Sequence, residues 1–314
     1  MISSNHLPKG KAGGYLALAT TSILWGTTWV SSKVAVSENL PPFQMASMRQ
    51  FFGGCCFLIF FIGYKKLPLP TLKQFGWLLL LGLLMFVLAN GLSTWSLKYI
   101  PTGLSALITA LYPFSVVITE RIFFKTQNLT PLTIIGLLLG VTGIGIVFYE
   151  NIFEHHPAGF LFGVVLSTLA MLSWSGGTMF IARNKLNINP YYAIGWQMMI
   201  SSVVLFVISR TIQTAIPLSE VSLRVWFAIG YLVVFGSIIS FIAFVYSMKK
   251  LPAAISSLYA YINPLVAMVT AALVVGEKLT MNILWGAIVT LTGVFLVNYS
   301  IKRNKQPIIA EPEQ

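Results

Sequence analysis

The stretch WSLKYIPTGLSALITALYP at residues 95–113 returns, with substitutions, as YSMKKLPAAISSLYAYINP at residues 246–264. Both prolines of this stretch recur 151 positions later, and the matched positions are Trp95-Ser96, Pro101, Ser105 and Pro113 with Tyr246-Ser247, Pro252, Ser256 and Pro264. Further along, a second set recurs 150 positions later: Gly136 and Thr142-Gly143 with Gly286 and Thr292-Gly293. The chain is therefore built from two similar halves. Duplicated sets of hydrophobic segments are typical of secondary transporters.

Composition places both halves in a lipid bilayer. The chain has 314 residues, of which 56% are hydrophobic and 9% are charged, whereas a soluble domain carries about a quarter charged residues. Apolar runs near twenty residues recur along the whole length, and each is about long enough to cross a bilayer core as a helix. A helix also satisfies its own backbone hydrogen bonds where water is absent. The sequence predicts an all-α integral membrane protein.

Ten transmembrane helices are predicted, near residues 13–36, 43–64, 75–97, 102–122, 131–149, 159–181, 191–211, 225–248, 253–275 and 282–300. With the N-terminus in the cytoplasm, most of the 20 Lys and Arg residues fall on the cytoplasmic side, as the positive-inside rule requires. Five helices per half is an odd number, so the second half enters the membrane in the opposite sense. We therefore predict two inverted five-helix repeats with both termini in the cytoplasm.

The expected organisation is a cytoplasmic tail at 1–12, repeats at 13–150 and 159–300, and a cytoplasmic tail at 301–314. The net charge of +12 is assigned to the positive-inside bias and not to nucleic acid. No cofactor or metal is expected, because the three histidines lie in the N-terminal tail and an outer loop. The expected partners are a small-molecule substrate and the lipid bilayer. A monomer is expected, with a homodimer through the Gly136–Gly140 helix face as the alternative.

The order of several motifs resembles the EamA family of the drug/metabolite transporter superfamily. The motifs are Trp25-Gly26 and Trp174-Ser175, Pro42 with Arg49 and Pro190 with Gln197, Tyr112-Pro113 and Asn263-Pro264, and Gly276-Glu277. The resemblance covers roughly residues 13–300. It implies that helices one to four of each half enclose a central cavity, and that the protein exports or exchanges small metabolites such as amino acids. It also implies a bacterial-type inner (plasma) membrane.

One position departs from the family pattern. The first-half counterpart of Gly276-Glu277 reads Thr126-Gln127. A function that needs two symmetric glutamates is therefore in doubt. We expect Glu277 to fix a helix end or a connector, and not to act as a coupling carboxylate.

Arg49 is the predicted membrane-embedded charge, since it lies nearly two turns into its helix. The chain contains no Asp, so two interpretations stay open. Arg49 clamps a substrate carboxylate or phosphate, for which the guanidinium is well shaped, or it bonds helix-end carbonyls or extends its charged end outward.

Polar and aromatic residues within the predicted helices are candidates for the cavity lining, because polar groups in lipid tend to face the bundle interior. Their alternative roles are helix contacts and interfacial belts. Together with Arg49, the predicted substrate-binding residues are Trp25, Asn90, Trp95, Tyr112, Trp174, Thr178, Gln197, Tyr246, Tyr259 and Asn263.

Several functions compete at this point. A secondary transporter working by alternating access leads, and a channel or a lipid flippase is the alternative. An intramembrane enzyme is disfavoured because the chain has no Asp and no histidine within a predicted helix. Titratable groups for proton coupling are limited to Glu120, Glu277 and the tyrosines. We therefore predict substrate movement down its own gradient, or loose coupling.

Overall fold

The computed structural model describes residues 9–119, 121, 130–153, 158–183, 187–213, 215–251 and 258–304. Over these residues the regular structure is entirely helical, which confirms the all-α class. Among the positions discussed above, those outside the described residues are Glu120, Thr126-Gln127, Pro252 and Ser256.

The first half contains these helices in chain order: α1 (Lys9–Ser37), α2 (Pro42–Leu58), η1 (Ile59–Tyr64), α3 (Leu72–Leu81), η2 (Gly82–Gly91), α4 (Leu92–Ser96), α5 (Thr102–Ala110), α6 (Tyr112–Thr119) and α7 (Pro131–Phe153). The second half contains α8 (Phe160–Arg183), α9 (Pro190–Ile212), η4 (Leu218–Glu220), α10 (Leu223–Tyr231), η5 (Leu232–Ile239), α11 (Ser240–Lys250), α13 (Tyr259–Val275) and α14 (Met281–Asn304).

Eight helical runs of the described chain are long and apolar enough to cross a membrane. They are Pro42–Tyr64, Leu72–Ser96, Thr102–Thr119, Pro131–Tyr149, Phe160–Ile181, Pro190–Ile212, Leu223–Lys250 and Met281–Ser300. Tyr259–Val275 is a shorter apolar helix, and the 29-residue α1 packs among the others in the same bundle. The chain is thus a multi-pass helical membrane protein.

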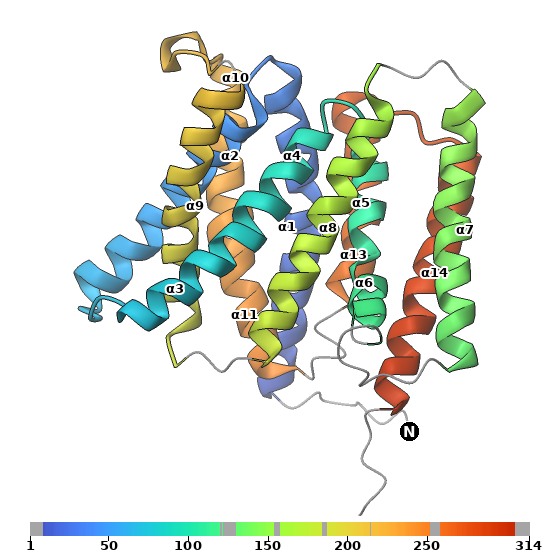
Figure 1. The fold of residues 1–314 in the computed structure, drawn as a ribbon, viewed down its shortest axis with the longest axis horizontal. Helices are drawn as coiled ribbons and strands as arrows, with labels where there is room; N and C mark the ends of the chain where they lie inside the picture. The colour runs from blue at the N-terminus through green and yellow to red at the C-terminus, as the bar shows by residue number, and fades with distance from the viewer. Residues whose placement is uncertain are drawn as a thin grey trace, which may run out of the picture.

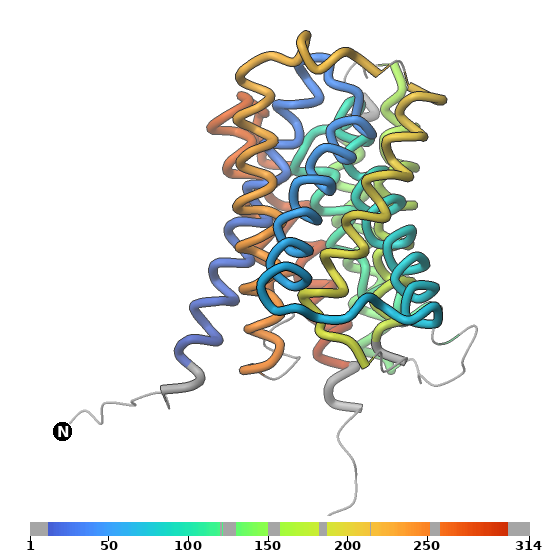
Figure 2. Tube along the Cα trace, turned by 90° about the vertical axis from the view of Figure 1, so that its left-hand side faces the viewer, coloured from blue at the N-terminus to red at the C-terminus, as the bar shows by residue number. Residues whose placement is uncertain are grey.

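Two helices, α1 and α8, organise the bundle (Figure 1). Helix α1 packs on α13, α10 and α11, whereas α8 packs on η2, α4, α5 and α6. Helix α2 pairs with α9, and α7 pairs with α14 along one edge of the molecule. Figures 1 and 2 also show that α1 begins and α14 ends at the same end of the bundle.

Glycines bring α7 and α14 into close contact. A Cβ at Gly136 would lie 2.8 Å from the Gly293 carbonyl oxygen, and one at Gly143 would lie 2.7 Å from the Gly286 carbonyl oxygen. A Cβ at Gly140 would lie 2.0 Å from a ring carbon of Phe114 in α6. Small residues allow helix backbones to approach. The Gly136–Gly140 face is therefore occupied within the chain.

The helix predicted over 102–122 is observed as one helical run over Thr102–Thr119 with a tighter turn inside it. This turn lies at Leu111, whose N–H bonds the Ile108 carbonyl at 3.1 Å. Pro113 follows at the second position of α6 and has no N–H to continue the ladder. Pro264 lies inside α13, so the two matched prolines lie in different local settings.

Two connectors at the end of the bundle opposite the termini are held by charged side chains. Glu277 accepts hydrogen bonds from the Thr102 N–H at 2.8 Å and the Thr102 hydroxyl at 2.6 Å, at the start of α5. Lys33 donates to the carbonyls of Leu97 at 2.5 Å and Ile100 at 3.3 Å. The structural role expected for Glu277, fixing a helix end, is what these bonds show.

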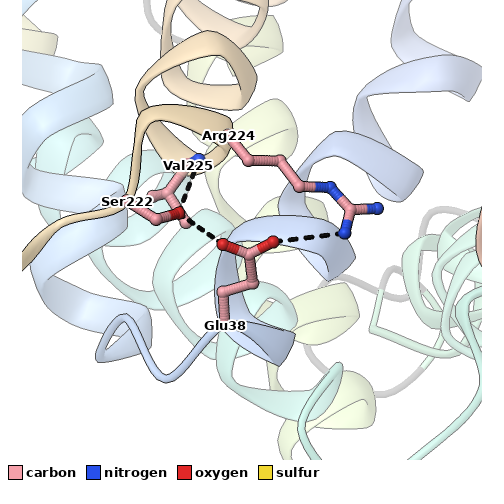
Figure 3. A network of polar contacts seen from close by, with 4 residues as sticks. All are labelled: Glu38, Ser222, Arg224 and Val225. Atoms are coloured by element: carbon pink, nitrogen blue, oxygen red, sulfur yellow. Dashed lines mark hydrogen bonds and ion pairs between the residues drawn. The ribbon is translucent and has the colours of Figure 1, made fainter.

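A second network joins the end of α1 to the start of α10 (Figure 3). Glu38 accepts a hydrogen bond from the Ser222 hydroxyl and pairs with Arg224 at 3.2 Å. The Ser222 oxygen also accepts from the Val225 N–H at 3.3 Å, which caps α10.

Candidate functional site

A central cavity lies between the two halves. It holds about 170 Å³ of space for water-sized molecules, which is room for on the order of ten waters or one small metabolite. Its walls come from α1, α2, η2, α4, α5 and α6 of the first half and from α8, α11 and α13 of the second. Trp25, Asn90 and Trp174 lie inside their helical runs, whereas Leu97 lies in the connector before α5, so the cavity extends toward the end of the bundle opposite the termini.

One face of α1 forms a wall of the cavity. Trp25, Thr28, Trp29 and Ser32 line it, and their spacing places them on one side of a helix. The Trp25 indole N–H donates to the Gly236 carbonyl at 3.1 Å. This carbonyl belongs to η5, a π-helical segment, and such segments often occur at functional sites.

Aromatic rings pack around Trp25. Its ring centroid lies 5.1 Å from Phe241, 5.3 Å from Tyr259 and 6.5 Å from Trp174, each in an edge-on arrangement. Such pairs contribute beyond their buried area. The residues come from α1, α8, α11 and α13, so this cluster joins the two halves beside the cavity.

Arg49 supplies the charge in the cavity wall. The residue is 6% exposed, and its Nε donates to the Ser237 hydroxyl at 3.0 Å. Gly236 leaves room for it, since a Cβ there would lie 3.1 Å from Arg49 Nη2. Among the described residues no carboxylate pairs with Arg49. Its guanidinium has further N–H groups to offer to the cavity.

Two asparagines in the lining have their carbonyl oxygens occupied. The Asn90 oxygen accepts from the Gln50 side-chain amide at 3.1 Å, and the Asn263 oxygen accepts from the Trp29 indole at 2.9 Å. Within the described part of the chain, neither amide nitrogen has a partner. Both asparagines therefore offer donors to the cavity.

Most of the predicted substrate-binding residues come together in this cavity, namely Trp25, Arg49, Asn90, Tyr112, Trp174, Tyr259 and Asn263. The others lie elsewhere. Trp95 packs on Phe43, and Thr178 bonds the Ser175 carbonyl within α8. Gln197 is buried where α9 meets Gly82, and Tyr246 is 39% exposed near the end of α11. A role for these residues in binding stays a prediction.

Sequence reasoning did not single out a further set of lining residues, which includes Thr28, Trp29, Ser32, Met85, Phe86 and Phe241. Trp29 carried a usable signal, because it follows Trp25 by one helical turn and thus shares its face. The apolar residues carried none, since an apolar side chain in a membrane helix faces lipid or protein equally well. Over the described residues no group of His, Cys, Asp and Glu is arranged to hold a metal ion.

An apolar helical bundle with a cavity that both of its halves line has the architecture of a membrane transporter. The sequence model of the EamA-like transporter family matches residues 12–149 and again residues 161–299. The chain belongs to this family, within the drug/metabolite transporter superfamily.

Known relatives agree with this assignment. The chain is 31% identical over 271 residues to the uncharacterized inner membrane transporter YedA of Escherichia coli strain K12, covering 84% of this chain and 83% of that protein. It is 24% identical over 293 residues to the uncharacterized transporter YoaV of Bacillus subtilis strain 168, covering 92% and 98%. A solved crystal structure at 14% identity matches with a TM-score of 0.63 over 94% of this chain and 99% of that one, which shows a shared fold.

Proposed function

We propose that the protein is a secondary transporter that exports or exchanges small metabolites across the inner membrane by alternating access. Amino acids are the class that the family resemblance suggests. The observation that carries the proposal is the cavity lined by residues of both halves. Alternating access requires a site that both halves share, so that their relative movement exposes it to each side in turn. We expect no enzymatic activity.

The proposed architecture is ten transmembrane helices in two inverted five-helix repeats. The helix contacts support it, because each contact between the two halves has a counterpart in which the halves have swapped roles. Helix α1 packs on α13 and α11 as α8 packs on α5, α6 and α4. The first helix of each half thus contacts the third and fourth helices of the other half. The two second helices, α2 and α9, also pair with each other, as do the two fifth helices, α7 and α14. Such matched contacts are expected if a two-fold axis relates the two halves.

The same end of the bundle carries the start of α1 and the end of α14 (Figure 2), which supports two termini in one compartment. We place that compartment in the cytoplasm because of the Lys and Arg bias. A single cysteine added at either end, in a background with Cys55 and Cys56 replaced by Ala, should react with an impermeant maleimide only after cell lysis. Reaction of one end in intact cells would refute the shared location.

Coupling to protons is not part of the proposal. Of the described lining residues, none is Asp, Glu or His, and Glu277 is engaged in capping α5. We propose movement down the substrate gradient, or loose coupling. If uptake by the parent protein depended on a proton gradient, and the Glu120→Gln and Glu277→Gln variants each lost that dependence, the proposal on coupling would be wrong.

Proteoliposome counterflow tests the function directly. Vesicles loaded with one unlabelled metabolite should accumulate the same labelled metabolite transiently, with saturation, when the protein is present. A panel of amino acids and organic acids identifies the solute. Flux that does not saturate and shows no exchange would indicate a channel, and movement of labelled lipid between leaflets would indicate a flippase. Absence of all three activities would overturn the transporter proposal.

A further inference from the structure

The charge in the cavity has one sign. Arg49 is the only charged side chain among the described residues that line it. Burying an ion without a partner costs several kcal/mol. A ligand that brings a negative charge recovers part of that cost, whereas a ligand ammonium would meet a like charge in a medium of low dielectric constant.

The amide groups of the lining also favour an anion. Asn90 and Asn263 each use their carbonyl oxygen on an internal donor, and each leaves an N–H₂ group for the cavity. Arg49 uses Nε on Ser237 and keeps its outer N–H groups. The donors come from three different elements, α2, η2 and α13. Carboxylate oxygens accept several such bonds at once.

Hydroxyl groups of the lining are neutral acceptors. Thr28, Ser93 and Thr109 each donate to the backbone carbonyl three residues earlier, at 2.7, 3.0 and 2.9 Å. Their remaining lone pairs can accept from a ligand hydroxyl or amide, but they carry no formal charge to balance an ammonium. Aromatic rings attract cations by about 0.5–2 kcal/mol, which does not offset the loss of hydration and the repulsion from Arg49.

The remainder of the wall is apolar. Trp25, Trp29, Trp174, Phe86 and Phe241 surround the polar groups, so they suit a hydrocarbon or aromatic body. We propose that the substrate is a singly charged organic carboxylate with an apolar body and no ammonium group. This inference rests on the proposed function, and it narrows the substrate class away from zwitterionic amino acids. A phosphate monoester fits less well, because its second charge finds no second cation in the described wall.

A ligand series with one body and different charges tests the class. Purified protein in nanodiscs at pH 7.5 is titrated by calorimetry with 4-methylpentanoate, leucine, 3-methylbutylamine, 4-methylpentanamide and 3-methylbutyl phosphate. A parallel series carries a phenyl body, with 3-phenylpropanoate as its carboxylate. The carboxylate of at least one series should bind about ten-fold tighter than its matched amide, since hydrogen bonds to a charged group are the stronger kind. The amine should bind more weakly than the amide.

Variants assign the effect to the cavity. Arg49→Gln should weaken the carboxylate about ten-fold and leave the amide nearly unchanged, while Arg49→Lys should retain part of the preference. Asn90→Asp, which adds a negative charge to the wall, should also abolish the preference for the carboxylate. Arg210→Gln is the matched control, because Arg210 is exposed on α9 beside Phe206 and outside the cavity. Equal melting temperatures show that the variants are folded.

Each other outcome overturns the inference. Tightest binding of leucine or of the amine would refute the exclusion of an ammonium, and transport of leucine in counterflow would then leave the transporter proposal standing. Tightest binding of the phosphate would assign the site to phosphate esters. If neither series bound, the carboxylate class would be rejected, and the counterflow panel would decide separately whether the protein is a transporter.

Discussion

The carboxylate of Glu277 caps the helix that begins at Thr102, although these residues lie 175 positions apart in the chain. The two oxygens accept from the Thr102 N–H at 2.8 and 2.9 Å, where the unpaired N–H groups of a helix start carry partial positive charge. Since Lys33 holds the carbonyls of the same connector, the turn between α4 and α5 is fixed from two sides. The cap ties the second half of the chain to the first.

Removing this cap should destabilise the fold. We expect Glu277→Gln to lower the free energy of unfolding by about 1–2 kcal/mol, because the amide loses the charge and one acceptor. Thermal unfolding of the detergent-purified protein measures the change. Glu220→Gln is the matched control, since Glu220 is exposed in a short turn. Equal melting temperatures for the two variants would contradict the role of the cap.

The pair between Glu38 and Arg224 should matter much less. Its side chains are 28% and 66% exposed, and exposed ion pairs contribute about 0–1 kcal/mol. We expect Arg224→Gln to change the melting temperature little, with a smaller effect still in high salt. A double-mutant cycle with Glu38→Gln gives the coupling energy. A coupling well above 1 kcal/mol would show that this network (Figure 3) is a structural clamp.

The close contact between α7 and α14 predicts that the stability of the protein depends strongly on side-chain size at this contact. In Gly143→Ala the new Cβ would lie 2.3 Å from the Thr290 hydroxyl oxygen and 2.4 Å from its backbone nitrogen. The helices must separate, at a cost of about 1–3 kcal/mol. Gly145→Ala, on the same helix with nothing within 4 Å, should be neutral or stabilising. Thermal unfolding of both variants is the measurement, and equal stability would show that the contact is not tight.

The hydrogen bond between Trp29 and Asn263 should influence ligand affinity independently of Arg49. Trp29→Phe removes the indole donor that orients the Asn263 amide. We expect affinity for the bound carboxylate of the matched series to fall about two- to ten-fold, the usual effect of losing a neutral hydrogen bond. Trp285→Phe is the control, because Trp285 is 60% exposed on α14. Unchanged affinity in Trp29→Phe would mean that Asn263 does not contact the ligand.

The sequence predicted the helical class well because an apolar run of twenty residues has few alternatives in lipid. It did not predict the π-helical segments Ile59–Tyr64, Gly82–Gly91 and Leu232–Ile239. Whether a helix tightens or widens locally depends on what packs against it and on the polar groups nearby. Those partners come from distant parts of the chain, and no local pattern records them.

The candidate site was predictable where a polar residue recurred in a duplicated motif. Trp25, Trp174 and Asn263 belong to such motifs, and all three line the cavity. The repeat makes Gln197 the counterpart of Arg49, but the two residues lie in different surroundings. Arg49 faces the cavity, whereas Gln197 is buried at a contact of α9 with Gly82. Two similar halves in one fixed arrangement need not present equivalent residues to a shared space.

The contact between α7 and α14 carries an evolutionary consequence. Gly136 meets Gly293 and Gly143 meets Gly286, and the repeat makes Gly136 equivalent to Gly286 and Gly143 equivalent to Gly293. The two halves thus contact each other through equivalent surfaces. Two separate half-length chains with this surface could pair in the same way, so fusion of the genes for such a pair would have needed no new interface at this edge.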